Sequence, residues 1–157
     1  MDTTLTKHER NLSAIIHAST FSRYFIPFGN FILPLVLWTA NKKDHKFVDY
    51  NGKQALNFQI SMFLYAFLLG VLTIPFFFGA FSDIFHTGYW SWRDFGGINW
   101  HFDSDDFRFG HLAWPLGIGG FLQGALSLVN IIYTILATIR TNEGQYFQYP
   151  FTIKFIK

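Results

Sequence analysis

The amino-acid sequence predicts an all-α integral membrane protein, a small polytopic helical bundle formed by one domain, residues 1–157. Two observations lead to this fold class. Half of the 157 residues are hydrophobic and only 14% are charged, whereas soluble domains carry roughly a quarter charged residues. The charges are also clustered, so residues 24–41, 54–82 and 109–139 contain no Asp, Glu, Lys or Arg. Apolar runs of about 20 residues are long enough to cross a bilayer as helix.

We expect four membrane segments, of which the first two, at about residues 12–26 and 31–41, form a short helical hairpin. Pro27 and Pro34 interrupt this apolar region, with Asn30 between them, and proline breaks the helical hydrogen-bond pattern. The two helices would measure about 22 and 16 Å, whereas a hydrocarbon core is roughly 30 Å thick. One long kinked span is the alternative, so the sequence leaves open whether Pro27–Pro34 is a deep turn or a kink.

The third and fourth segments are expected at about residues 54–81 and 112–140. The outer loop between them, residues 82–111, carries five aspartates against two arginines and is rich in Trp, Tyr and Phe. Such aromatic residues favour the headgroup region, so we expect an aromatic extracytoplasmic loop that lies on the membrane. The tail, residues 141–157, interleaves aromatic and polar residues and is expected to lie along the membrane interface.

The basic residues indicate how these segments are oriented. Seven of the twelve lysines and arginines lie either in the charged loop, residues 41–53, or after the third uncharged run. The acidic outer loop contains only Arg93 and Arg108. The positive-inside rule then places the charged loop and both termini in the cytoplasm of a multi-pass protein of the bacterial inner membrane. Asn51 and Gly52, near the end of the charged loop, are expected to be turn or cap residues.

Polar side chains within the apolar runs are the candidate interaction residues, because a buried amide without a partner costs about 1–3 kcal/mol. Gln54 and Asn57 share one helical face and are expected to pack against the hairpin and the last segment. Gln59 lies off that face, so we expect it to contact another chain. The last segment carries a polar stripe that is most simply explained by helix packing. The full set of candidates is Asn30, Gln54, Asn57, Gln59, Gln123, Ser127 and Asn130.

Arg23 is a candidate intramembrane charge, and such a residue is expected to face the bundle or to extend toward the headgroups. A third polar face, formed by Ser13, His17 and Thr20, is expected on the first helix. All three polar faces would then meet inside the bundle and satisfy one another's hydrogen-bonding groups.

The sequence contains no combination of residues typical of catalysis, so we do not expect an enzyme. It has no cysteine. The stretch Asp103–Asp106 offers oxygen ligands for a hard cation but lacks the glycine and the distal glutamate of an EF-hand loop. We therefore predict neither a metal nor another cofactor. The net charge of +2 is too small to indicate nucleic-acid binding.

Residues 48–59, with the sequence VDYNGKQALNFQ, resemble a bacterial membrane family of unknown function that is similar to the Tic-twenty protein of the chloroplast inner-envelope import complex. The same resemblance is carried by residues 26–30, IPFGN, by Pro34, and by the later Gly144, Tyr146, Tyr149 and Pro150. It implies a compact helical membrane domain that often works as a subunit of a larger complex. The resemblance points to no catalytic residue.

These observations favour a non-enzymatic inner-membrane subunit, an accessory or scaffold of a larger membrane complex, with protein translocation as one role to test. The expected partners are the lipid bilayer and other membrane protein subunits. The alternative is a small channel or transporter with a polar path along the last helix, lined by Gln123, Asn130 and Asn57, with Arg23 as a further candidate.

Overall fold

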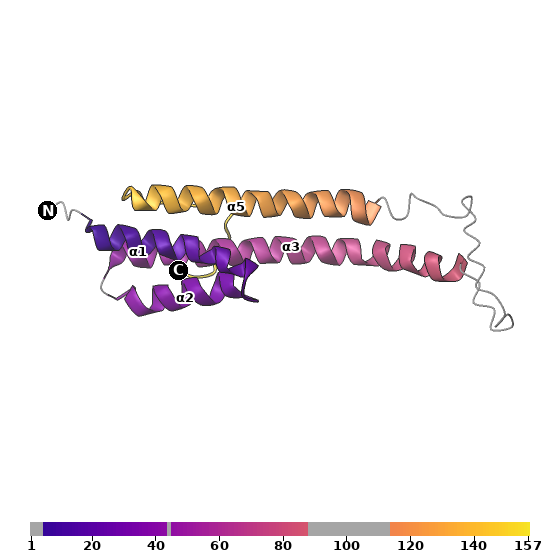
Figure 1. The fold of residues 1–157 in the computed structure, drawn as a ribbon, viewed down its shortest axis with the longest axis horizontal. Coiled ribbons are helices and arrows are strands. Elements are labelled where there is room, and N and C mark those ends of the chain that lie inside the picture. The colour runs from indigo at the N-terminus through magenta and orange to yellow at the C-terminus, as the bar shows by residue number, and fades with distance from the viewer. Residues whose placement is uncertain (1–4, 44, 88–113) are drawn as a thin grey trace. The chain divides into compact units, whose positions relative to one another are not determined.

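The computed structural model describes residues 5–43, 45–87 and 114–157, and their side chains except at residues 75–87 and 114–116. Every regular element in these residues is a helix (Figure 1). Most of the predicted outer loop, including Asp103–Asp106, lies outside them. The elements are α1 (Lys7–Ala18), the 3-10 helix η1 (Ser19–Tyr24), α2 (Gly29–Asn41), α3 (Lys46–Thr87), the π-helix η2 (Trp114–Gly119) and α5 (Gly120–Asn142).

The chain forms two compact units. The first combines Met1–Tyr65 with Leu126–Lys157, and the second is Ala66–Ala125. The first unit contains α1, η1, α2, the start of α3, most of α5 and the tail, and it holds all the buried side chains discussed below. In the second unit Gly119 lies close to Thr73, because a Cβ atom added at Gly119 would be 2.7 Å from the Thr73 methyl group.

A capping box begins α1. The Thr6 hydroxyl accepts a hydrogen bond from the Glu9 backbone at 3.2 Å, and the Thr6 backbone N–H donates to the Glu9 carboxylate at 2.9 Å. This arrangement satisfies backbone donors that the first helical turn would leave unpaired. The same carboxylate lies 3.1 Å from His45 Nδ1, so Glu9 also ties the start of α1 to the residue before α3.

The predicted hairpin is confirmed as two helical arms joined by a short turn. The α1–η1 arm and α2 lie side by side (Figure 1), and the turn between them passes through Phe28, which has a φ of 59°. Gly29 follows, with Ser22 so close that a Cβ atom at Gly29 would lie 2.6 Å from its hydroxyl. This turn separates η1 from α2, so a single kinked helix through this region is excluded. Pro34 is accommodated inside α2.

The expectation of a charged loop over residues 41–53 was wrong, because α3 already begins at Lys46. Asn51 and Gly52 are therefore helical residues, neither turn nor cap. The Asn51 amide donates to the Phe47 carbonyl at 2.9 Å, which removes the local competition that usually makes asparagine a turn residue. At Gly52 the Trp38 indole takes the place of a side chain, since an added Cβ atom would lie 2.2 Å from its ring.

Two helical stretches, Lys46–Ile74 and Gly117–Asn142, are long and apolar enough to cross a membrane. They overlap the third and fourth predicted segments, 54–81 and 112–140, and the third starts eight residues earlier than expected. The outward faces in the first unit are also apolar: α2 exposes Ile32 and Val36, and α5 exposes Leu128 and Ile132. Such faces suit a lipid environment.

Candidate functional site

A buried polar cluster at the centre of the first unit connects four parts of the chain. His17 of α1 lies 3.3 Å from the Asn51 side-chain oxygen of α3 and 2.9 Å from the Tyr149 hydroxyl of the tail. Thr141 of α5 donates to the same Asn51 oxygen at 3.3 Å. His17, Asn51 and Thr141 are fully buried and Tyr149 is 2% exposed. The cluster therefore holds α1, α3, α5 and the tail together.

The bonding pattern fixes which His17 nitrogen carries the proton. The Asn51 amide nitrogen is used in the bond to the Phe47 carbonyl, so the oxygen of Asn51 must face His17 and accept. His17 Nε2 is then the donor, and Nδ1 of the neutral ring accepts from the Tyr149 hydroxyl. The hydrogen bonds of the cluster therefore run from the Tyr149 hydroxyl to His17 and from His17 to the Asn51 oxygen.

The tail binds three side chains on one face of α3, which are Asn57, Ser61 and Tyr65. Asn57 donates to the Ile156 carbonyl at 2.9 Å and accepts from the Phe155 and Ile156 backbone N–H groups at 3.1 and 2.8 Å. The Ser61 hydroxyl accepts from the Ile153 N–H at 2.9 Å. Asn57 and Ser61 thus give the tail backbone hydrogen bonds of the kind that a neighbouring strand would supply in a sheet.

At the inner end of this face the tail reverses direction. The Tyr65 hydroxyl donates to the Phe151 carbonyl at 2.8 Å, and Phe151 has a φ of 57°. Between α5 and this turn, Tyr149 stacks on Phe58 with ring centroids 4.0 Å apart. The tail is therefore packed into the first unit, and the interfacial position of residues 141–157 stays a prediction.

Gln59 joins three helices. Its side-chain oxygen accepts from Asn30 of α2 and from Asn130 of α5, each at 3.2 Å, and Gln59 is 1% exposed. The expected contact of Gln59 with another chain is therefore excluded in this fold, because its exposed surface is almost nil. Its amide nitrogen is buried and has no partner among the described residues.

The other candidates are placed less centrally. Gln54 is half-buried, and its side chain makes no hydrogen bond to another described residue. Along α5 the predicted stripe is not uniform: Gln123 is exposed, Ser127 is half-buried and Asn130 is buried. Packing of Asn57 against the last segment was also expected, whereas its partners are tail residues.

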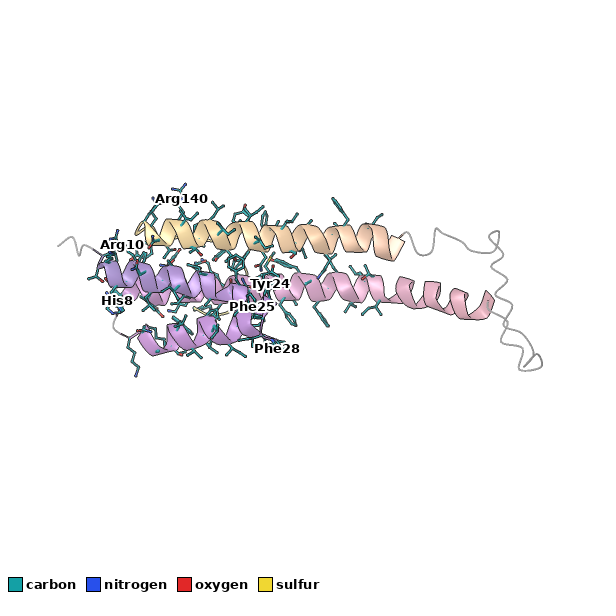
Figure 2. All side chains as sticks on the ribbon, viewed as in Figure 1. His8, Arg10, Tyr24, Phe25, Phe28 and Arg140 are labelled. Atoms are coloured by element: carbon teal, nitrogen blue, oxygen red, sulfur yellow. The ribbon has the colours of Figure 1, made fainter. Side chains whose placement is uncertain are left out.

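Arg23 lies near the closed end of the hairpin and is exposed, with its guanidinium carbon 5.7 Å from the centre of the Tyr24 ring. Beside it Tyr24, Phe25 and Phe28 point outward, and Figure 2 shows them at the opposite end of the hairpin from His8. Phe25 is 86% exposed, the largest fraction among the exposed apolar residues.

A charged cluster lies at the start of α3. The Trp38 indole N–H donates to Asp49 at 2.9 Å, and Lys53 pairs with the same carboxylate at 2.6 Å. Lys42 lies over the Trp38 ring, 4.4 Å from its centre. Within the described residues no three His, Cys, Asp or Glu side chains are grouped so that they could hold a metal ion.

Sequence reasoning missed two of the connections described above. It placed His17 on a polar face, which was a usable signal, but it gave no role to Tyr149 and treated Asn51 as a turn residue. Tyr149 lies 132 residues from His17, so no local pattern links them.

The comparisons with known proteins agree with a membrane protein but change its expected family. A model of the magnetosome magnetite crystal formation protein family, MamF/MmsF, matches residues 8–156. Comparisons with curated proteins and with solved structures give no match. The family match agrees with the expectation of a bacterial membrane family. It gives no support for the expected similarity to the Tic-twenty protein. This chain therefore belongs to the magnetosome magnetite crystal formation protein family.

Proposed function

We propose that this protein is a non-enzymatic accessory protein that is embedded in a bacterial membrane and acts in magnetite crystal formation. The observation that carries the proposal is the family match over residues 8–156. Two helical stretches of membrane-spanning length support it. The family match offers no link to protein translocation, so that part of the sequence-based hypothesis has no support.

We infer that α3 and α5 cross the membrane and that the hairpin enters and leaves it on the side of the α2–α3 connection. Lys42, Lys46 and Lys53 cluster near the start of α3, and Arg140 lies near the end of α5. The positive-inside rule then favours a cytoplasmic location for this end and for both termini. Residues 88–113 would face the opposite compartment.

The absence of cysteine gives this topology a direct test. Single cysteines at Thr3 and Ser104 can be probed with a maleimide that does not cross membranes, in sealed membrane vesicles whose cytoplasmic face points outward. We expect labelling at Thr3→Cys, and labelling at Ser104→Cys only after the membrane is opened. Equal labelling of both sites in sealed vesicles would contradict the topology.

We propose that the acidic residues in the sequence between the two spans bind iron as the material of the growing crystal, which differs from the resident metal ion that the sequence does not predict. Five aspartates against two arginines lie in residues 82–111, and carboxylate oxygens are the ligands that hard cations prefer. A strain that forms magnetite and lacks its own family member, complemented with this chain, should recover crystal size by electron microscopy. Replacing Asp103, Asp105 and Asp106 by asparagine should remove that recovery, and Glu143→Gln should not. Full recovery by the triple variant would refute this role.

We further propose that other membrane protein subunits bind the apolar outer faces. The support is the exposed row Leu128, Ile132, Ile135 and Ile139 on α5, which exceeds what packing within the first unit uses. Purification in a mild detergent should yield partners in fixed stoichiometry. A monodisperse monomer free of partners would contradict this part of the proposal.

A channel along the last helix has weaker support. Asn130 donates to Gln59 and Thr134 is fully buried, so these two side chains are engaged in packing within the first unit. Reconstituted flux that disappears in Asn130→Leu, while the variant keeps its thermal stability, would revive the channel hypothesis.

A further inference from the structure

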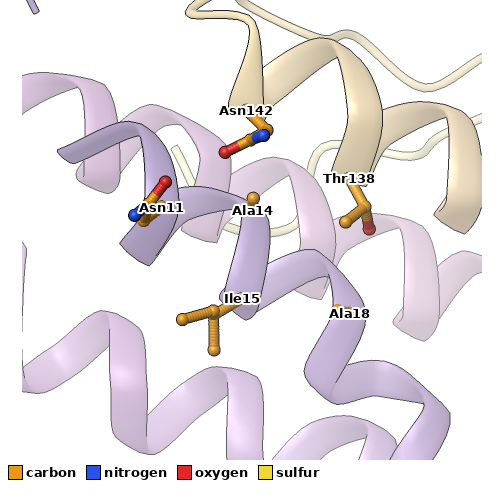
Figure 3. A pocket seen from close by; sticks show the side chains of 6 residues that line it. All are labelled: Asn11, Ala14, Ile15, Ala18, Thr138 and Asn142. Atoms are coloured by element: carbon orange, nitrogen blue, oxygen red, sulfur yellow. The ribbon is translucent and has the colours of Figure 1, made fainter. Parts of the chain in front are cut away.

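A surface groove between α1 and α5 is not used by any contact described so far. It has a volume of about 210 Å³ and is lined by Asn11, Ala14, Ile15 and Ala18 of α1 and by Thr138 and Asn142 of α5 (Figure 3). We propose that this groove binds one phospholipid with an anionic headgroup. The acyl chain would lie along the alanines and the headgroup beside the two asparagines. The inference rests on the membrane placement proposed above.

The apolar half of the groove comes from small residues at helical spacing. Asn11, Ala14 and Ala18 follow one another at intervals of three and four residues, so they lie on one face of α1. The two alanine methyl groups leave room between α1 and α5 that larger side chains would fill. Ile15 borders this part and is 53% exposed, and the groove therefore offers an apolar surface.

The polar half combines amides with basic residues. Figure 3 shows the carboxamides of Asn11 and Asn142 at the same end of the groove. Neither side chain has a hydrogen-bond partner among the described residues, and each can donate two hydrogen bonds to phosphate oxygens. Lys7 lies on the groove face of α1, one turn before Asn11. Arg10 reaches the same end, since its Cδ atom would lie 3.1 Å from a Cβ atom at Gly144.

The charges at this end favour an anion. The Arg10 Nε atom is buried and has no partner among the described residues. Glu9 keeps its negative charge, but its carboxylate is directed toward Thr6 and His45. Glu143 follows Asn142 in the chain and is the remaining acidic residue in this part of the sequence. A phosphate group would supply the hydrogen-bond acceptor that Arg10 Nε lacks among the described residues.

The order of polar and apolar parts matches the depth of a phospholipid in the membrane. Asn142 is the last residue of the spanning stretch of α5, so the amide end lies at headgroup level. Thr138 and the alanines lie one turn and more deeper, at the level of acyl chains.

The test counts lipids that stay bound to the purified protein. The full chain is reconstituted into bilayers of equal phosphatidylglycerol and phosphatidylcholine, extracted in mild detergent and examined by native mass spectrometry. We expect one retained lipid per chain, with phosphatidylglycerol favoured about fivefold, which corresponds to about 1 kcal/mol from one basic residue near the headgroup. Lys7→Ala should reduce that preference and still retain a lipid.

Two variants and one crosslink decide between the outcomes. Ala18→Phe fills the groove and should lose the retained lipid, whereas Ala40→Phe, at an exposed site on α2, should keep it. Lipid retention unchanged in Ala18→Phe would overturn the proposal. So would an efficient disulfide between two chains of Ala18→Cys, because it would show a second copy in the groove. Extraction of the whole protein by alkaline carbonate would instead show that the membrane placement is wrong.

Discussion

The variant Asn57→Leu should weaken the binding of the tail to α3 by an amount that can be estimated from the lost hydrogen bonds. Leucine keeps the size of the side chain and removes three hydrogen bonds to the tail backbone, with Asn57 itself 3% exposed. At about 1 kcal/mol for each bond, the docked tail should lose roughly 3 kcal/mol. Since 1.4 kcal/mol is a factor of ten, the detached state should become more populated by about two orders of magnitude.

Limited trypsin digestion in mild detergent measures this change. Cleavage after Lys154 requires the neighbouring backbone to leave α3, so its rate follows the population of the detached tail. We expect much faster cleavage in Asn57→Leu and a lower temperature of thermal unfolding. The matched control is Gln54→Leu, which removes an amide from the same helix without breaking a hydrogen bond described in the fold. Equal cleavage rates in the two variants would refute the role assigned to Asn57.

Three further predictions test other parts of the first unit. Tyr149→Phe should lower the free energy of unfolding by about 1–2 kcal/mol, because a buried imidazole nitrogen loses its donor; unchanged chemical denaturation would contradict the proposed proton arrangement. Gly52→Ala should destabilise the protein by more than about 2 kcal/mol, since the new methyl group would strike Trp38. The control Gly70→Ala has open space around the new methyl group and should be neutral or stabilising by about 0.5–1 kcal/mol. Hydrogen bonds from the Thr6 backbone and hydroxyl hold the pKa of Glu9 below its ordinary value of 4.5, so this group stabilises the fold above that pH and the contribution is lost as pH falls through the lowered pKa. Glu9→Gln should therefore show a smaller loss of stability on acidification below about pH 5, measured by thermal unfolding across a pH series.

The parts of the fold that depend on composition and local breaks could be predicted from the sequence. Uncharged runs gave the two span-length stretches, because the charge pattern reports directly on the surrounding solvent. Pro27 and Pro34, with Asn30 between them, predicted the hairpin, because proline restricts the backbone locally. Helix boundaries near the ends of charged segments were less well determined, as the early start of α3 at Lys46 shows.

The parts that depend on tertiary contacts could not be predicted. Asn51 has the propensity of a turn residue, but burial beside His17 and Thr141 keeps it helical. Gln59 lies off the face shared by Gln54 and Asn57, and the sequence does not say that Asn30 and Asn130 approach it from the other side. The docking of the tail on α3 was missed for the same reason, since no local pattern links Asn57 to Ile156.

The attachment of the tail to α3 also has a consequence for the order of folding. Asn57 and its partner Ile156 are 99 residues apart in the chain, so α3 is synthesised and inserted long before its binding partner exists. Until the tail arrives, the polar groups of Asn57, Ser61 and Tyr65 must be satisfied by water or by the insertion machinery. Closing such distant contacts is slow compared with helix formation, so we expect tail docking to be the last step of assembly. Pulse-chase protease protection should show the helices protected before Lys154 is.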